Sequence, residues 1–151
     1  MKNLFDTTSA NEVRTRLGKL GPQSKRQWGK MTAPQMLAHC SVSMQWAVGE
    51  VVPEQGPLPV RLLGRVIKPL VFRNDDPLRK NSPTAKSLLI ADERDLGRER
   101  ERLSGLIERF VAGGAAGCTT NPHSFFGKMT PQQWAILMYK HLDHHLRQFE
   151  V

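Results

Sequence analysis

The sequence has little of what membrane-spanning or disulfide-stapled proteins need. No apolar run approaches the about 18 residues of a membrane span, and the first residues, Met1–Asp6, lack the apolar stretch of a secretion signal. Its two cysteines, Cys40 and Cys118, are too few for a disulfide framework, and we expect both to be reduced packing residues. These absences predict a cytoplasmic protein without a transmembrane segment, and its length suits one domain over residues 1–151.

The sequence also has fewer acidic than basic residues. The chain has 22 Lys and Arg against 14 Asp and Glu, which gives a net charge of +8. Such a charge favours anionic partners: acidic small molecules, nucleic acid or a lipid surface. Nucleic acid is disfavoured, because no zinc-finger, basic-zipper or RNA-binding signature is present and the charges of residues 94–109 alternate in sign, as on a solvated helix face. We expect a small-molecule substrate of anionic character.

No sustained alternation of apolar and polar residues indicates a sheet, whereas helical periodicity is frequent. The clearest helix starts lie at Thr32 and Thr130. In both places a Thr that can cap the helix is followed three residues later by Gln, the spacing of a capping box, and a Pro lies in the first turn. We predict helices from Thr32 to about Val48 and from Thr130 to near the end of the sequence.

Two further helices are predicted from weaker signals. Ser9 and Glu12 have capping-box spacing, and Gly21-Pro22 ends the apolar pattern that follows them. Asp92 can cap another helix, which Gly113-Gly114 ends. Four helices joined by loops predict an all-α protein, specifically a four-helix bundle.

An extra segment lies between the second and third helices of this set. Residues 60–72 mix aliphatic side chains with cations and predict a short amphipathic helix that ends near Pro69. The cations of this region are Arg61, Arg65, Lys68 and Arg73. The segment could lie on a membrane surface or serve as a lid or connection over the core. Its cations also allow a nucleic-acid or lipid-binding function as an alternative to catalysis.

Three of the five histidines fall within five residues near the end of the chain. His141 and His145 are four residues apart, so on a helix they share one face and can reach one metal ion. His39 lies on the inward stripe of the second helix, and an up-down-up-down bundle would run that helix parallel to the last one, which brings His39 near the level of His141. Three imidazoles suit Zn, Ni, Fe(II) or Cu and leave positions open, so that bound water could become a nucleophile. The alternative is a polar seam of hydrogen-bonded histidines, and Leu142 replaces the glutamate that a His-Glu-x-x-His protease needs.

A helical wheel of the last helix separates its remaining polar residues from the apolar arc. Lys140, Asp143 and Arg147 fall on the opposite side, and His144 is expected to be exposed. Asp143 or Gln148 could hydrogen-bond to a ligand imidazole, although the wheel points Asp143 outward.

Several motifs together resemble the DinB/YfiT-like superfamily, and within it a bacterial subfamily of uncharacterised function. They are Phe125–Thr130, Trp134, Tyr139–Phe149 (which contains YKHLDHHLRQF), Ser82–Thr84 and Ala91–Arg94. The resemblance implies a bundle with pseudo-symmetric helices and a divalent metal held by His39, His141 and His145. It further implies thiol-dependent transferase or isomerase chemistry with a low-molecular-weight thiol, and a homodimer.

His123 precedes the Phe-Phe-Gly turn and could lie at the mouth of the site as a catalytic acid, base or substrate anchor. A capping or surface role is the alternative. The sequence as a whole favours a metal-dependent enzyme acting on a small molecule, first a transferase that uses a low-molecular-weight thiol. The alternatives are a metal-dependent hydrolase and a non-enzymatic stress-response or ligand-binding bundle with structural histidines.

Overall fold

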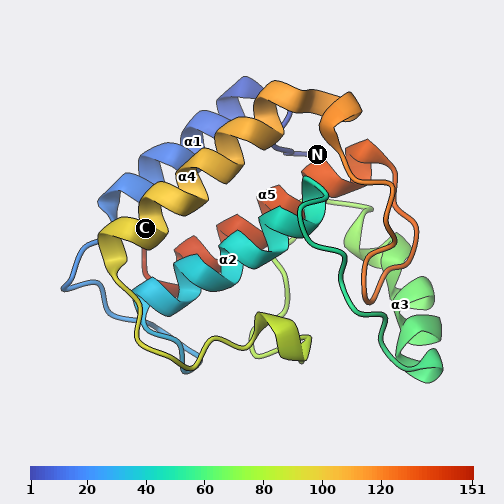
Figure 1. Ribbon diagram of the computed structural model, residues 1–151, viewed down its shortest axis with the longest axis horizontal. Helices are drawn as coiled ribbons and strands as arrows, with labels where there is room; N and C mark the ends of the chain where they lie inside the picture. The colour runs from blue at the N-terminus through green and yellow to red at the C-terminus, as the bar shows by residue number, and fades with distance from the viewer.

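The computed structural model describes residues 1–151, and it is all-helical, with five α-helices and no β-strand. The helices are α1 (Thr7–Lys19), α2 (Ala33–Ala47), α3 (Leu58–Val71), α4 (Leu96–Gly113) and α5 (Pro131–Gln148) (Figure 1). Two short 3₁₀ turns, η1 (Lys86–Leu88) and η2 (Gly114–Gly117), lie in the connections. None of the helices has both the length and the apolar composition for crossing a bilayer.

Both predicted capping boxes are confirmed. The Thr32 hydroxyl accepts from the backbone N–H of Gln35, and the Gln35 side chain accepts from the N–H of Thr32. The same reciprocal pair forms between Thr130 and Gln133 at the start of α5. These local interactions fix where α2 and α5 begin, which matters because both helices carry candidate ligands.

The predicted caps of the other two helices are wrong by about one turn. Asp6, not Ser9, caps α1, and its carboxylate accepts from both the N–H and the hydroxyl of Ser9. Asp95, not Asp92, caps α4, while Asp92 pairs with Arg94 instead. In both regions several residues can cap a helix within one turn, and an aspartate takes the cap in place of the predicted residue.

The amphipathic segment forms α3, which extends past its predicted end. Pro69 lies inside the last turn, and the helix ends at Val71 rather than near Pro69. A proline so close to the helix end disturbs few of the following hydrogen bonds. Of the residues in α3 only Gly64 is buried, so this helix lies on the surface, at the right of Figure 1.

The other four α-helices pack against one another in pairs, α2 with α4 and α5, and α1 with α4 and α5. In Figure 1, α1 and α4 lie side by side, and α2 lies in front of α5. The contacts Leu4–Ala135 and Arg16–Asp143 show that α1 and α5 run in the same direction. The contact from Ser43 to His141 and that from His39 to His145 show that α2 and α5 are antiparallel.

The antiparallel order contradicts the predicted up-down-up-down arrangement. The long connection of residues 48–95, which contains α3 and η1, carries the chain back so that α4 runs parallel to α2. The hydrogen bonds between Gln35 and Asp92 and between Gln45 and Arg102 show that α2 and α4 are parallel. The chain therefore reverses direction between α1 and α2 and between α4 and α5, but not between α2 and α4.

The hydrophobic core lies between these four helices. Its largest fully buried side chains are Trp46, Trp134, Phe110, Leu4, Met36, Leu37, Met44, Leu103, Ile107, Met138, Leu146 and Val13. Cys40 is also fully buried, and its thiol contacts the sulfur of Met36, as expected of a packing cysteine. Cys118 is free and half-buried after η2. The candidate ligands on α2 and α5 therefore project from rigid, well-packed helices.

Candidate metal centre

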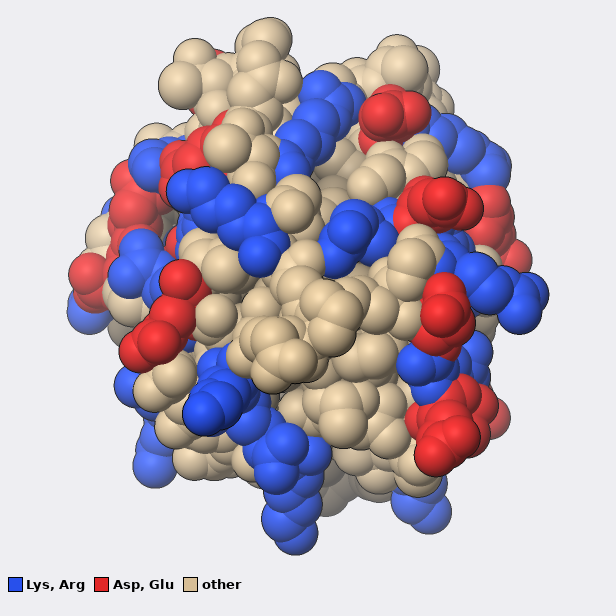
Figure 2. All heavy atoms as spheres, turned by 90° about the vertical axis from the view of Figure 1, so that its left-hand side faces the viewer, with Lys and Arg blue, Asp and Glu red and all other residues tan.

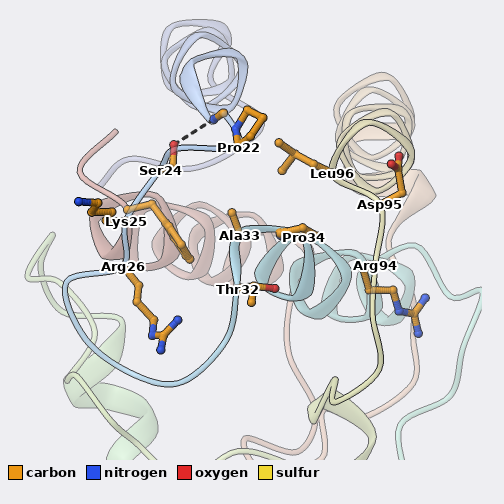
Figure 3. A pocket seen from close by; sticks show the side chains of 12 residues that line it. Pro22, Ser24, Lys25, Arg26, Thr32, Ala33, Pro34, Arg94, Asp95 and Leu96 are labelled. Carbon is orange, nitrogen blue, oxygen red and sulfur yellow. Dashed lines mark hydrogen bonds between the residues drawn. The ribbon is translucent and has the colours of Figure 1, made fainter.

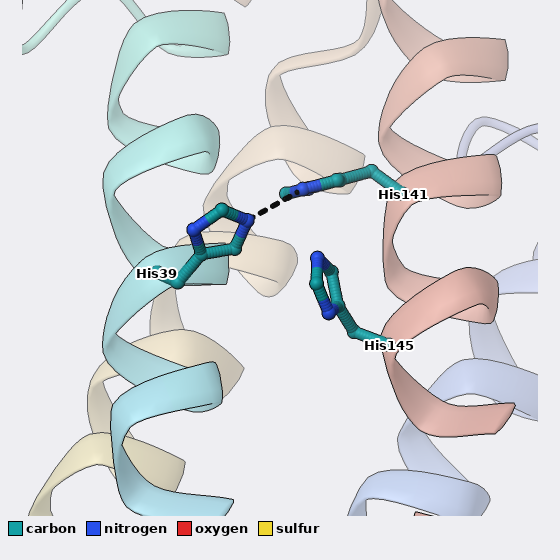
Figure 4. Close-up of side chains that lie close together, drawn as sticks. All are labelled: His39, His141 and His145. Carbon is teal, nitrogen blue, oxygen red and sulfur yellow. Dashed lines mark hydrogen bonds between the residues drawn. The ribbon is translucent and has the colours of Figure 1, made fainter. Parts of the chain in front are cut away.

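The structure brings His39, His141 and His145 together between α2 and α5 (Figure 4). One nitrogen from each lies within 4.8 Å of the other two, and the ring centroids are 4.6–4.9 Å apart. His39 and His145 are buried, and His141 is partly exposed. The cluster could hold a metal ion.

The ring of His39 is fixed by a backbone carbonyl from the long connection. Its Nδ1 lies 2.8 Å from the carbonyl oxygen of Leu88 in η1. A carbonyl oxygen can only accept, so Nδ1 carries the proton and Nε2 presents a lone pair. That Nε2 lies 2.9 Å from Nε2 of His141, at the centre of the cluster.

The ring of His145 is fixed in the same way by a side-chain amide. Its Nδ1 lies 2.9 Å from Oε1 of Gln148, and the amide nitrogen of Gln148 donates to the carbonyl of Trp28 at 2.7 Å. The bond to Trp28 sets the orientation of the amide, so its oxygen must face His145. Nδ1 of His145 therefore carries the proton, and its Nε2 is left as a lone pair.

His141 is the one ring whose tautomer has two solutions. Its Nδ1 lies 2.9 Å from the hydroxyl of Ser43, and that hydroxyl also lies 2.9 Å from the carbonyl of Cys40. If Ser43 donates to Cys40, it accepts from Nδ1 of His141, and Nε2 becomes a lone pair. If Ser43 donates to His141 instead, Nε2 carries the proton and donates to His39. The first arrangement gives three inward lone pairs, and the second leaves only Nε2 of His145 without a partner when no cation is bound.

Burial keeps these imidazoles neutral. It lowers the pKa of His39, lowers that of His145 to about 3, and lowers that of His141 well below its usual value. The neighbouring rings act in the same direction, because a second positive charge in the cluster would be repelled. The neutral imidazole is the form that binds metals, so the environment favours a ligand set.

The donors fit a metal that prefers nitrogen. With Zn–N bonds of about 2.0–2.1 Å in a tetrahedral site, ligand nitrogens stand about 3.3 Å apart. The two Nε2 atoms of His39 and His141, at 2.9 Å, would need to separate by only a few tenths of an ångström. In the first arrangement of Ser43 these two lone pairs face each other, and a cation between them removes that repulsion. Three imidazoles suit a catalytic more than a structural site, because at least one coordination position remains open.

His123 lies outside this cluster and holds the turn that precedes α5. Its Nδ1 accepts from the backbone N–H groups of Phe125 and Phe126, at 3.1 and 3.2 Å. Its ring packs among Trp46, Phe126 and Trp134, and burial lowers its pKa to about 4. These contacts match the capping alternative, and its catalytic role stays a prediction.

The wheel misplaced two polar residues of α5. Asp143 was expected to point outward, but it is buried and pairs with Arg16 at 2.7 Å and Arg147 at 2.8 Å. Lys140 is also buried, and its ammonium group donates to the carbonyls of Val71 and Asp76. The reason is that α1 and the long connection cover the side of α5 that the wheel assigned to solvent.

The neighbour His144, expected to be exposed, is partly buried. Its Nδ1 lies 3.2 Å from the carbonyl of Leu78, and its ring contacts Trp28 and His145. It has no place in the three-histidine cluster. His144 is therefore a natural control for the other two histidines of α5.

Sequence reasoning missed part of what orients the imidazoles. Gln148 was considered as a partner and does contact His145, whereas Asp143 contacts no ligand. Ser43 was not linked to His141. Its position four residues after His39, on the same helix face, was the available signal. The carbonyls of Leu88 and Trp28 leave no signal in the sequence.

A separate hollow of about 680 Å³ lies at the end of the molecule where α2 and α4 begin (Figure 3). Its lining includes Lys25, Arg26 and Arg94, with Asp95 as its acidic residue. Figure 2 shows this side of the molecule, where Lys and Arg surround a central group of uncharged side chains and acidic residues lie toward the edges. The hollow contains none of the three clustered histidines.

Fold and site together define an all-helical protein with a buried group of three histidines that could hold a metal ion. The chain belongs to the family described as "Protein of unknown function (DUF1569)", whose model matches residues 2–151. No curated protein and no solved structure matches it. The expectation of an uncharacterised family is confirmed, and membership of the DinB/YfiT-like superfamily stays a prediction.

Proposed function

We propose that this protein is a metal-dependent enzyme acting on a small molecule, with a divalent metal held by His39, His141 and His145. We also propose that the chain is one DinB-like four-helix-bundle domain with α3 as an added element. The observation that supports the metal site best is the outward anchoring of the imidazoles. Leu88 and Gln148 take the Nδ1 protons of two rings, Ser43 can take the third, and all three Nε2 atoms then face one point.

A divalent metal bound there would supply Lewis acidity and lower the pKa of a water or thiol in an open position. The protein's own contribution is orientation and exclusion of water. The hydrogen bonds of His39 and His145 hold their rings in the ligand tautomer before any metal arrives. Because His141 is the partly exposed member, we propose that the open positions face the solvent on its side.

The first candidate reaction is transfer with a low-molecular-weight thiol. The thiol would have to come from outside, because Cys40 contacts Met36 and burial raises the pKa of its thiol. The net charge of +8 suits an anionic thiol or substrate. A metal-dependent hydrolase uses the same open position with water, and it is the second candidate. Homodimer formation, which the superfamily resemblance implies, remains part of the proposal.

One observation favours the non-enzymatic alternative. With the Ser43 hydroxyl donating to His141, every nitrogen of the cluster except Nε2 of His145 has a partner without a metal. The same histidines could then be structural, in a bundle that binds a ligand elsewhere or acts in a stress response.

The deciding experiment is elemental analysis of untagged protein. Wild type should carry about one divalent metal per chain, and His141→Ala should lose it, because two imidazoles seldom hold a metal alone. His144→Ala is the matched control, since His144 is on the same helix but outside the cluster, and it should keep the metal. Thiol transfer and hydrolysis assays would follow. Absence of metal after incubation with Zn, Ni, Mn and Fe(II) would refute the proposed site.

A further inference from the structure

Helix α3 turns its apolar side to the solvent. Val66 is 72% exposed and Leu58 64% exposed, which is unusual for a helix with so clear an apolar side. The exposed set on this side, here called the α3 apolar face, comprises Leu58, Leu62, Leu63, Val66 and Leu70. An ordinary surface helix would bury such residues against the core, so this face requires a partner.

The outward orientation is fixed by contacts on the other side of the helix. Gly64 is the buried residue of α3, and a Cβ there would lie 2.0 Å from the carbonyl oxygen of Phe125. Lys68 donates to the carbonyl of Lys128, which lies with Phe125 in the segment before α5. The small residue therefore packs against the turn before α5 and leaves the apolar face outside.

The charge of this region indicates what covers the face. From Gln55 to Asn74 the chain has no acidic residue, but it has four cations. At ~100° per residue, Arg65 lies next to Leu62 along the edge of the apolar face, with Arg61 one turn before Arg65. A helix with exposed aliphatic residues beside a purely cationic edge fits the boundary between anionic headgroups and acyl chains. We propose that α3 docks the protein on a bilayer surface that contains anionic phospholipid.

A second copy of the chain fits less well. A symmetric contact through α3 would place the same cations of both copies together, and each copy has a net charge of +8. An anionic bilayer instead offers opposite charge to Arg61 and Arg65 and an apolar layer to the α3 apolar face. Nucleic acid would match the charge but not the aliphatic side chains.

The test is flotation with lipid vesicles made of phosphatidylglycerol and phosphatidylcholine in equal parts, against vesicles of phosphatidylcholine alone. Wild type should float with the anionic vesicles only. The pair Arg61→Gln and Arg65→Gln should weaken partitioning about 25-fold, at about fivefold per cation. The control pair Lys19→Gln and Arg98→Gln removes the same charge from exposed positions of α1 and α4, and it should lose far less.

The apolar contribution is tested by Leu62→Ser with Val66→Ser, which should weaken partitioning at least about tenfold. Both side chains are largely exposed, so the variant should fold, and circular dichroism and thermal melting check this. Failure of wild type to float, or equal losses in the control pair, would overturn the proposal. So would a concentration-dependent dimer in sedimentation equilibrium that this variant abolishes, because the face would then belong to a second copy.

Discussion

Acidification should destabilise the metal-free protein through its buried histidines. Burial lowers the pKa of His145 to about 3 and that of His123 to about 4, from an ordinary value of 6.5. The folded state therefore keeps these rings neutral at pH values where the unfolded chain protonates them. Unfolding therefore takes up protons below about pH 6.5. The free energy of unfolding has its full value above this pH and falls as the pH drops toward the pKa values of the folded state.

The size of the effect follows from how far the pH lies below the ordinary histidine pKa of 6.5. At pH 5, each of these two histidines is about 1.5 units below its ordinary pKa, which at 1.36 kcal/mol per unit costs about 2 kcal/mol. Together His123 and His145 should remove about 4 kcal/mol between pH 7.5 and pH 5. His39 and His141 act in the same direction, because burial lowers their pKa values as well. Carboxylates contribute little in this window, since most remain ionised in both states.

Urea unfolding followed by circular dichroism at both pH values, with a chelator present, measures this loss. His123→Gln removes one titrating ring, so its stability should depend less steeply on pH, by about 2 kcal/mol over the same interval. This difference is independent of how much the substitution destabilises the protein at neutral pH. A wild-type free energy that changes by less than about 1 kcal/mol would refute the assignment of these rings as buried and neutral.

Three further outcomes are expected. Gln148→Met removes the acceptor of the His145 proton and should weaken metal affinity about 10- to 100-fold. Gln148→Glu also loses the bond to Trp28 but keeps an acceptor for that proton, so it should weaken metal affinity less. Competition with a chromophoric chelator measures both variants, and equal affinities would contradict the orienting role. Gly64→Ala places a Cβ 2.0 Å from the carbonyl oxygen of Phe125. The midpoint of urea unfolding should therefore fall by the equivalent of about 1–3 kcal/mol. An unchanged midpoint would show that α3 does not pack against the turn before α5. Asp143→Ala leaves the partly buried guanidinium of Arg16 without its closest carboxylate, so the free energy of unfolding should fall by about 2–3 kcal/mol. This corresponds to a melting temperature lower by about 4–12 °C, and the metal content should be unchanged.

The sequence was most informative where a local interaction alone decides the structure. The capping boxes at Thr32 and Thr130 are complete within four residues, so both helix starts were predicted correctly. At α1 and α4 the nearby alternatives Asp6 and Asp95 take the cap, and choosing between neighbouring caps depends on how the helix docks. Hydropathy could not place Asp143 correctly, because its burial depends on Arg16, more than a hundred residues away.

The three histidines came together although the predicted direction of α2 was wrong. In this antiparallel pair His39, in the middle of α2, is level with His145, and Ser43, one turn after His39, is level with His141, one turn before His145. The inward faces of the two helices, which periodicity does reveal, were therefore sufficient to predict the ligands. The relative direction was set by the long connection of residues 48–95, whose path leaves no periodic signal.

Helical periodicity does not reveal the groups that hydrogen-bond to each imidazole and so decide which of its nitrogens carries the lone pair. These groups come from η1, from α2 and α5, and from the carbonyl of Trp28 before α2. They reach the cluster only when the long connection and the α1–α2 loop are in place. A chain could therefore keep all three histidines on the correct helix faces and still lack a ligand set. Loss of the partner at Ser43 or Gln148 should thus affect metal binding more than it affects the fold, because each orients one imidazole while the core between the helices remains.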